Sequence, residues 1–446
     1  MPTFRFPQGF LWGSATSSHQ VEGHTHNDWS EWEKKHAERL AREAHLKFGH
    51  LPHWEQRRPV AEDPANYISG AACDHYNRFR EDFDIARELG HTAHRFSLEW
   101  SRIEPEEGRF DEAAIQHYRE VLEALRERGI EPFITLWHWT NPVWIAEMGG
   151  VENKKFAERF ERYTRFVAGR LGDLVKFWVT LNEPTSIIGA AYLNGNWPPQ
   201  KKSLLSAYRV YHVLAEAHNR AFHAIHENDP DAQVGFANIL QSFVPYKKDS
   251  WSDRVTVTLA HFFTNKYMLR LTRDHNDFLT VQYYFHTRLR FIRRTHNLDH
   301  PESDLGWEIY PEGIYHILRW LKRYNLPIYI TENGLADDVD SRRAEFIRNH
   351  LCWIHKAISE GVDVRGYFHW SLLDNFEWDK GFWPRFGLVA VDYATQARTL
   401  RESARIYAEI CRTNTLVLAD PYLGERSEEK ERATGTAPEI PASPGT

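Results

Sequence analysis

Residues 328–334 read IYITENG, and this stretch has the form of a buried β-strand that ends on a charged residue. Isoleucine, tyrosine and threonine are enriched in strands. Glu332 follows them at the strand's end, and burying an ionised carboxylate without a partner is costly. The stretch is one of a series of similar runs, and the series decides the fold.

Seven other short runs rich in β-branched and aromatic residues occur along the chain. They are residues 10–16 (FLWGSAT), 92–100 (TAHRFSLEW), 132–139 (PFITLWHW), 177–184 (FWVTLNEP), 232–239 (AQVGFANI), 278–285 (FLTVQYYF) and 364–371 (VRGYFHWS). Helical patterns lie between most of them, because apolar residues recur there at i, i+3 and i+4. Eight strands alternating with helices predict a single (β/α)₈ barrel. A doubly wound open sheet is the alternative, but no Gly-rich phosphate turn follows the first run.

Composition limits the classes of partner. The chain has 446 residues and a formal charge of −7, which is mild and gives no reason to expect nucleic acid. Its three cysteines lack CxxC spacing and its histidines form no HExxH pair, so we expect no disulfide framework, no metal and no cofactor. With no signal-peptide pattern and no apolar stretch of transmembrane length, we expect a soluble cytoplasmic protein without a membrane partner. The oligomeric state cannot be read from the sequence.

Two segments depart from the alternating pattern. The barrel is predicted to occupy residues 1–424, with a charged, Trp-rich insertion at about residues 24–72 that forms loop and helix over one end. Residues 425–446 are polar and contain few apolar side chains. We therefore expect this tail to be disordered.

Polar side chains follow the predicted strands, at the end of a barrel where active sites lie. Asn182 and Glu183 end one strand, and Glu332 ends another. Near the ends of the other strands, or in the loops after them, stand Gln20, Arg95, His138, Trp139, Tyr284, Trp370, Glu377 and Trp378. Paired carboxylates among hydroxyl-binding groups and flat aromatics are what glycoside hydrolysis needs. Tyr284 and Arg95 are suited to keep one carboxylate ionised.

Each of these residues also has an ordinary structural explanation. A single glutamate after a strand is more often a helix cap or one half of a salt bridge. His138 could be a hydrogen-bonded core histidine, Asn182 a turn cap and Arg95 part of a structural ion pair. The catalytic interpretation gains weight only because all of them are predicted at the same end of the barrel.

Four motifs in order resemble glycoside hydrolase family 1, the retaining β-glucosidases and β-galactosidases. They are FLWGSATSSHQVEG (residues 10–23), TLNEP (180–184), IYITENG (328–334) and HWSLLDNFEW (369–378). The resemblance extends to about Asp420. It implies hydrolysis of terminal β-D-glucosyl residues through a glycosyl-enzyme, with β-D-galactosyl and β-D-fucosyl residues left open, and small β-glycosides or oligosaccharides as partners.

The resemblance also implies a role for each site residue. Glu332 would be the nucleophile and Glu183 the general acid/base, with Tyr284 and Arg95 orienting and ionising Glu332. The sugar would be bound by Gln20, His138, Trp139, Asn182, Trp370, Glu377 and Trp378, with Trp307 on the leaving-group side. Activity would fall on both sides of a mildly acidic optimum.

Departures from the family pattern leave alternatives to test. Gln282 stands where asparagine is common, and Asn141 in HWTNP is expected to alter the rim of the site. A 6-phospho-β-glycosidase is disfavoured because Glu377 would repel a phosphate. The myrosinase branch, which lacks the acid/base carboxylate, is disfavoured because Glu183 is present. A non-catalytic sugar-binding barrel and a metal-dependent barrel enzyme are the remaining alternatives.

Overall fold

The computed structural model describes residues 2–291, 293–295 and 301–418. The predicted tail at residues 425–446 lies outside these residues. Each of the eight predicted strands forms. They are β2 (Leu11–Ala15), β3 (Ala93–Ser97), β4 (Glu131–Trp137), β5 (Phe177–Asn182), β6 (Gln233–Ala237), β8 (Leu279–Gln282), β11 (Ile328–Asn333) and β12 (Val364–Trp370).

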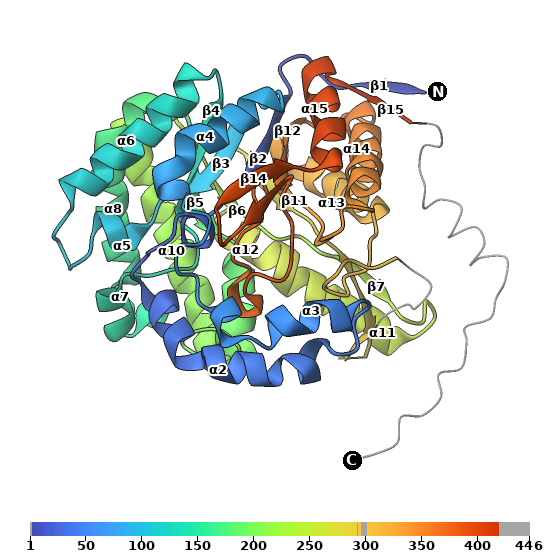
Figure 1. Ribbon diagram of the computed structural model, residues 1–446, viewed down its shortest axis with the longest axis horizontal. Coiled ribbons are helices and arrows are strands. Elements are labelled where there is room, and N and C mark those ends of the chain that lie inside the picture. The colour runs from blue at the N-terminus through green and yellow to red at the C-terminus, as the bar shows by residue number, and fades with distance from the viewer. Residues whose placement is uncertain (1, 292, 296–300, 419–446) are drawn as a thin grey trace.

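These strands form one parallel sheet that curls into a barrel (Figure 1). The order is β6-β5-β4-β3-β2-β12-β11-β8, so neighbours in sequence are neighbours in space. Backbone hydrogen bonds join the two outer strands, from the amide of Gln282 to the carbonyl of Asn238 (3.0 Å) and from Asp277 to Val234 (2.8 Å). The (β/α)₈ barrel is therefore confirmed and the open sheet is excluded.

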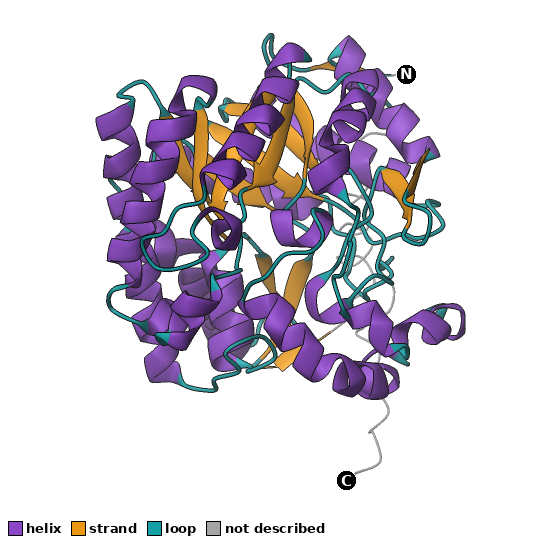
Figure 2. Ribbon diagram, turned by 60° about the vertical axis from the view of Figure 1, so that its left-hand side comes forward, coloured by secondary structure: helices purple, strands orange, loops and turns teal. Residues whose placement is uncertain are grey.

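Helices surround the strands on the outside, as Figure 2 shows in purple and orange. The main ones are α4 (His75–Glu88), α6 (Glu112–Glu127), α8 (Phe156–Leu171), α10 (Leu204–Asn228), α13 (Glu312–Leu321), α14 (Arg343–Ser359) and α15 (Glu402–Thr413). Helix α6 begins where Asp111 accepts hydrogen bonds from the amides of Ala113 and Ala114. It buries the stripe that the 3.6-residue period predicts, including Ile115 and Leu122.

Shorter elements connect these units or lie outside the barrel. The short helices are α1 (Ser18–Val21), α5 (Trp100–Ile103), α7 (Val143–Glu147), α9 (Pro184–Ile187), α11 (Trp251–Ala260) and α12 (Tyr267–Leu271), and η5 (His261–Lys266) joins the last two. The strands outside the barrel are β1 (Thr3–Arg5), β7 (Ser242–Pro245), β9 (His286–Arg290), β10 (Arg293–Thr295), β13 (Val389–Asp392), β14 (Ala397–Leu400) and β15 (Thr415–Val417).

Aromatic side chains fill the amino-terminal end of the barrel. Phe133 and Phe177 stack with their ring centres 4.2 Å apart, and Phe278, Tyr329 and Phe368 pack around Phe133. Each is 8% exposed or less. This plug fills the interior of the barrel at that end, and active sites of such barrels lie at the carboxyl ends of the strands.

Helices α2 (Asp28–Phe48) and α3 (Trp54–Ala61) occupy the segment around residues 24–72 (Figure 1, lower edge). Asn27 and Ser30 form a capping box at the start of α2. Glu33 on α2 bonds His19 (2.6 Å), and the Asn66 amide donates to the carbonyl of Lys380 (2.9 Å). The segment therefore supports loops at the carboxyl end of the barrel.

None of the helices in the described part of the chain is long and apolar enough to cross a membrane. Cys73, Cys352 and Cys411 are buried. Across residues 2–291, 293–295 and 301–418, no group of three or more His, Cys, Asp or Glu side chains is placed to hold a metal ion.

Candidate active site

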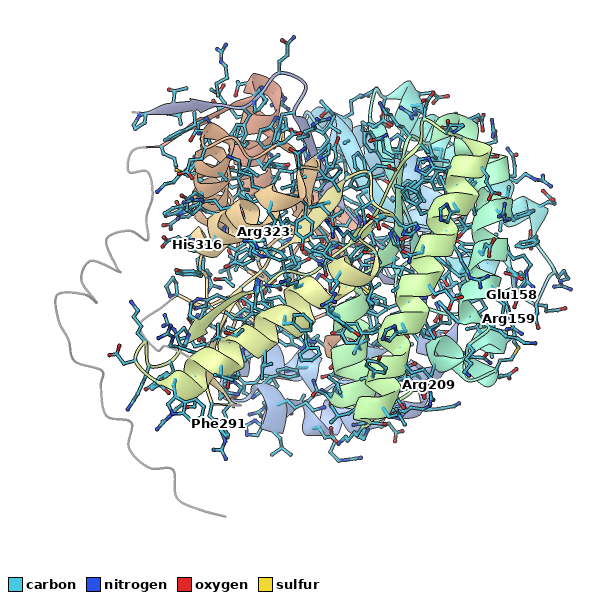
Figure 3. All side chains as sticks on the ribbon, turned by 180° about the vertical axis from the view of Figure 1, so that it is seen from behind. Glu158, Arg159, Arg209, Phe291, His316 and Arg323 are labelled. Carbon is cyan, nitrogen blue, oxygen red and sulfur yellow. The ribbon has the colours of Figure 1, made fainter. Side chains whose placement is uncertain are left out.

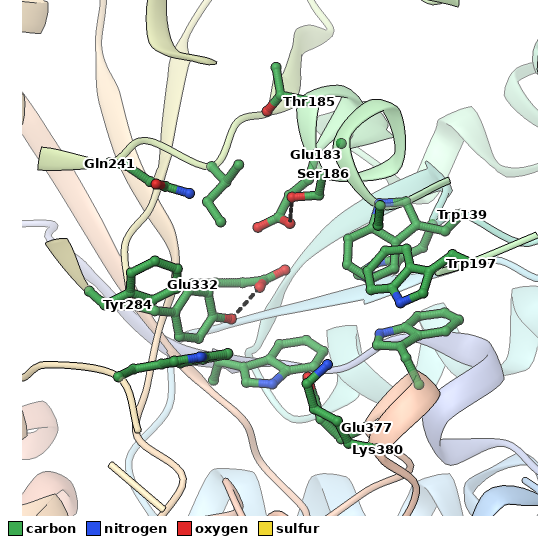
Figure 4. Close-up of a pocket in the computed structure, with 18 of the residues that line it drawn as sticks. Trp139, Glu183, Thr185, Ser186, Trp197, Gln241, Tyr284, Glu332, Glu377 and Lys380 are labelled. Carbon is green, nitrogen blue, oxygen red and sulfur yellow. Dashed lines mark hydrogen bonds between the residues drawn. The ribbon is translucent and has the colours of Figure 1, made fainter. Parts of the chain in front are cut away.

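A cavity of about 390 Å³ lies at the carboxyl ends of the barrel strands (Figure 4). Ten of the twelve residues singled out in the sequence line it: Gln20, His138, Trp139, Glu183, Tyr284, Trp307, Glu332, Trp370, Glu377 and Trp378. The other two, Arg95 and Asn182, are buried beneath it and touch its lining. The tertiary structure thus gathers all twelve at one place.

Glu332 at the end of β11 has the partners that its burial requires. Its carboxylate is paired with the Arg95 guanidinium on β3 and accepts hydrogen bonds from the Gln282 amide (2.6 Å) and the Tyr284 hydroxyl. Burial raises the pKa of Glu332, and the Arg95 charge and the Tyr284 hydrogen bond oppose that rise. These contacts favour the ionised form and fix the direction of the carboxylate.

Asn182 connects this group to His138. Its Oδ1 accepts from Arg95 Nη2 (2.6 Å) and Gln282 Nε2 (3.0 Å), so its Nδ2 must donate to Nε2 of His138 (3.0 Å). Burial and the Arg95 charge lower the pKa of His138, which is therefore neutral. Because Nε2 accepts, the proton lies on Nδ1. That nitrogen is buried and has no partner within the described residues.

Glu183 faces Glu332 across the cavity (Figure 4). It follows β5 with a backbone φ of 40°, a left-handed conformation that is costly for a residue with a side chain. Its carboxyl accepts one hydrogen bond from Ser186 (2.7 Å). Burial, together with the nearby charge of Glu332, raises the pKa of Glu183 to about 8. Glu183 therefore has fewer partners that favour its ionised form than Glu332 has.

Aromatic rings form the walls of the cavity. The Trp139 ring lies 4.8 Å from Trp197 and 4.9 Å from Trp378, measured between ring centres. His19 stacks on Trp378 at 5.4 Å with an interplanar angle of 16°. The Trp139 indole donates to the carbonyl of Asn182 (2.9 Å). Flat apolar surfaces in fixed orientations suit the faces of a sugar ring.

Gln20 and Glu377 form a polar side of the cavity. The Gln20 amide donates to the carbonyl of Phe376 (2.8 Å), while its oxygen accepts from Ser17 (2.6 Å). Burial raises the pKa of Glu377 to about 7, and the Lys380 charge opposes the rise. The Lys380 ammonium is bonded to Asp379 (2.7 Å).

Several lining residues were not predicted from the sequence, among them Ser186, Trp197, Gln241 and Lys380. Lys380 could have been found, because it follows the NFEW motif by two residues. Gln282 was noted as a departure, and it donates to both Asn182 and Glu332. Asn141 was expected at the rim, but its amide bonds Asp28 at the start of α2 (2.8 Å) and it does not line the cavity.

Comparison with known proteins identifies relatives along nearly the whole chain. The model of "Glycosyl hydrolase family 1" matches residues 3–272 and 253–416. Beta-glucosidase A of Thermotoga maritima is 35% identical over 467 aligned residues, covering 92% of this chain and 99% of that protein. A beta-galactosidase of Sulfolobus acidocaldarius is 31% identical, covering 92% and 95%.

Solved structures agree with these matches. The beta-glycosidase from Pyrococcus horikoshii superposes with a TM-score of 0.83 at 35% identity, covering 98% of this chain and 99% of that one. The beta-glucosidase from Thermotoga maritima in complex with glucoimidazole has a TM-score of 0.80 at 34% identity, covering 92% and 99%.

Proposed function

The chain belongs to glycosyl hydrolase family 1, and on that premise we propose that it releases terminal β-D-glucosyl residues by a retaining double displacement. It is a β-glycosidase. The observation that carries the finer proposal is the contrast between the two carboxyls. Burial raises the pKa of both, but Glu332 has three donors that oppose the rise, whereas Glu183 has one and its pKa reaches about 8.

In the first step Glu332 attacks the anomeric carbon while Glu183 gives its proton to the glycosidic oxygen. The bond to the leaving group breaks and a glycosyl-enzyme ester forms on Glu332. Once Glu332 is esterified, its charge no longer raises the pKa of Glu183. Glu183 then accepts a proton from water as the water oxygen attacks the anomeric carbon, which breaks the ester bond, releases the sugar and returns Glu332 as a carboxylate. The mechanism requires the two carboxyls to be roughly 5–5.5 Å apart.

A glucosyl unit suits the polar groups around the two carboxyls. His138, Gln20 and Glu377 line the cavity and offer imidazole, amide and carboxyl groups to the ring hydroxyls. Trp370 and Trp378 would cover the apolar face of the ring. The curated relatives are named as acting on both glucosides and galactosides, so β-D-galactosyl and β-D-fucosyl units stay within the proposal.

A 6-phosphorylated sugar is a poorer match for the cavity. Lys380 is the cation that lines it among the described residues, and its ammonium is already bonded to Asp379. Glu377 stands on the same side and would repel a phosphate when ionised. We therefore favour neutral sugars.

The anomer released first and azide rescue test the mechanism. Hydrolysis of nitrophenyl β-glucoside followed by proton NMR should show β-glucose first, whereas α-glucose would exclude retention. Glu332→Gly should be inactive, and added azide should restore turnover with α-glucosyl azide as the product. With Glu183→Ala, added azide should instead give β-glucosyl azide. Glu131→Gln, at the opposite end of β4, is the control and should behave as the parent does.

A panel of nitrophenyl β-glycosides with the same leaving group would settle the sugar. We expect kcat/KM to be highest for the β-glucoside or the β-fucoside. Turnover of 6-phospho-β-glucoside that exceeds turnover of β-glucoside would overturn the preference for neutral sugars.

A further inference from the structure

A stripe of large apolar side chains is exposed on α11 and the start of η5. Trp251, Val255, Leu259 and Phe263 are 78%, 48%, 53% and 49% exposed. Each follows the previous one by four residues, so they lie about one turn apart along one face of the helix. Exposed apolar residues that form a continuous row, rather than lying singly, mark a surface that another apolar surface covers.

The turn between β9 and β10 adds another exposed aromatic side chain beside the start of α11. Phe291 in that turn is 59% exposed and is labelled near one end of α11 in Figure 3. Its amide donates to buried Asp253 of α11 (2.8 Å), and the same carboxylate accepts from the amide of Lys247 (3.1 Å). Asp253 thus holds the two exposed aromatics, Trp251 and Phe291, on one fixed edge.

Basic side chains surround this edge. Lys247, Lys248, Arg254, Arg290 and Arg293 are all exposed. None of the five forms an ion pair with any residue that the structure describes. The exposed acidic side chains in the described part of residues 246–295 are Asp249 and Asp274. The positive charge is therefore local, on a chain whose formal charge is −7.

We propose that this surface, formed by Trp251, Val255, Leu259, Phe263 and Phe291 with the five basic residues around them, docks on a lipid membrane that carries anionic headgroups. A helix that lies in the membrane interface presents Trp, Phe and Leu on one face with Lys and Arg beside them. Lys and Arg side chains close to the membrane surface are attracted to anionic lipid headgroups. The sequence had suggested no membrane partner because it lacks a spanning segment, and docking at the interface needs none.

A second copy of the chain fits this surface less well. In a two-fold dimer the same patch meets itself, so the five unpaired cations would be brought close to their symmetry mates. Like charges brought together at an interface are destabilising. Anionic headgroups instead supply the opposite charge together with an apolar layer.

The docking surface shares its elements with the mouth of the active site. Gln241, Thr264 and Phe285 line the cavity, and they stand directly before β7, on η5 and directly before β9. Docking would therefore bring the cavity to the membrane, where β-glycosides with a lipid aglycone are located. This consequence rests on the proposed β-glycosidase function, whereas the docking itself does not.

Vesicle flotation tests the docking without using turnover. The full chain is mixed with vesicles of phosphatidylcholine and phosphatidylglycerol, or of phosphatidylcholine alone. We expect it to float with the anionic vesicles and to be released at about 1 M salt, where the Debye length is ~3 Å. Trp251→Ser/Phe291→Ser should lower the partition coefficient about tenfold or more. Lys247→Glu/Lys248→Glu should abolish the preference for anionic vesicles.

Matched controls carry the same changes elsewhere. Leu46→Ser/Val339→Ser alters side chains that are 82% and 74% exposed, and Lys154→Glu/Lys155→Glu alters another exposed lysine pair. Both should float as the parent does, and all four variants should keep the parent's thermal midpoint. Equal partition on both vesicle types, or equal loss in the controls, would overturn the proposal. So would light scattering that shows a dimer which Trp251→Ser/Phe291→Ser dissociates.

Discussion

Arg95 and Glu332 are 237 residues apart in the chain, yet their side chains form an ion pair inside the barrel, where Arg95 is 0% exposed. Breaking a buried pair by removing one partner leaves a buried charge without compensation. The pair therefore both stabilises the folded chain and sets the charge of the proposed nucleophile. Its neighbours offer more selective tests than Arg95 itself.

Tyr284→Phe removes a hydrogen bond that favours the ionised form of Glu332. The pKa of Glu332 should rise, so the acid limb of the kcat/KM profile should move to higher pH. A hydrogen bond to a charged group of this strength implies a loss in kcat/KM of about 10- to 100-fold. The measurement is the pH profile with an aryl β-glucoside.

Tyr283→Phe is the matched control. Its hydroxyl is also buried and hydrogen-bonded, but to the carbonyl of Tyr310 and away from the cavity. It should lower the free energy of unfolding by about 1 kcal/mol and leave the acid limb unmoved. A shift of that limb in Tyr283→Phe as large as in Tyr284→Phe would contradict the role given to Tyr284.

The raised pKa of Glu183 should make both the activity and the stability of the protein depend on pH. Its pKa of about 8 means that the protonated acid is lost as pH rises through that value, so kcat/KM should fall on the alkaline side near pH 8. With a nitrophenolate leaving group, which needs little protonation, Glu183→Gln should retain the first step and lose this alkaline limb. An alkaline limb that persists unchanged in Glu183→Gln would assign it to another group.

The same group should destabilise the folded chain as pH rises. Its folded pKa lies above the unfolded value of about 4.3, so between the two the folded state binds the extra proton and the free energy of unfolding falls with pH. Glu183→Gln removes this loss. It should be more stable than the parent at pH 8 by on the order of 2 kcal/mol, with the difference shrinking toward pH 4. Denaturant unfolding at both pH values measures this, and a Glu183→Gln variant no more stable at pH 8 would show that Glu183 is ionised without cost.

Gln282 tests whether the longer amide has replaced asparagine as a bridging donor. Gln282→Leu leaves Asn182 and Glu332 each with one donor fewer and should lower kcat about 100-fold, because a charged hydrogen bond is lost. The kcat of Gln282→Asn, whose side chain is shorter, should lie between that of the parent and that of Gln282→Leu. Gln233→Leu, at the other end of the barrel, should retain the parent's kcat. A fully active Gln282→Leu would show that Arg95 and Tyr284 suffice.

Lys380 is expected to act on the charge of Glu377. Its ammonium opposes the rise that burial causes in the pKa of Glu377, which lies at about 7. Lys380→Met should raise that pKa further, so that Glu377 is protonated at neutral pH and accepts hydrogen bonds from the sugar less well. KM should rise severalfold at pH 7 with little change in kcat. Lys380→Arg should keep the KM of the parent, and Lys35→Met on the exposed side of α2 should leave KM unchanged. An unchanged KM in Lys380→Met would show that Lys380 has no part in sugar binding.

The sequence by itself determined the barrel and most of the polar and aromatic residues singled out that line its cavity. Strand runs such as IYITENG and helical stripes such as that of α6 are local patterns, because burial of one face imposes a period on adjacent residues. Since parallel strands in a barrel all point the same way, a polar residue at a strand's end is placed at the common mouth without knowledge of any contact. For this reason Glu183, Glu332 and the residues near the other strand ends could be predicted.

Only the tertiary structure decided how those side chains meet. The three donors to Glu332 and the proton on Nδ1 of His138 depend on distances between segments remote in sequence. The raised pKa values of Glu183 and Glu332 have the same origin, because burial and neighbouring charge are properties of the folded site. The exposed stripe on α11 was also hidden from the sequence, since its apolar period is that of a helix packed on a core. Only the arrangement of the neighbouring elements shows that this stripe faces outward.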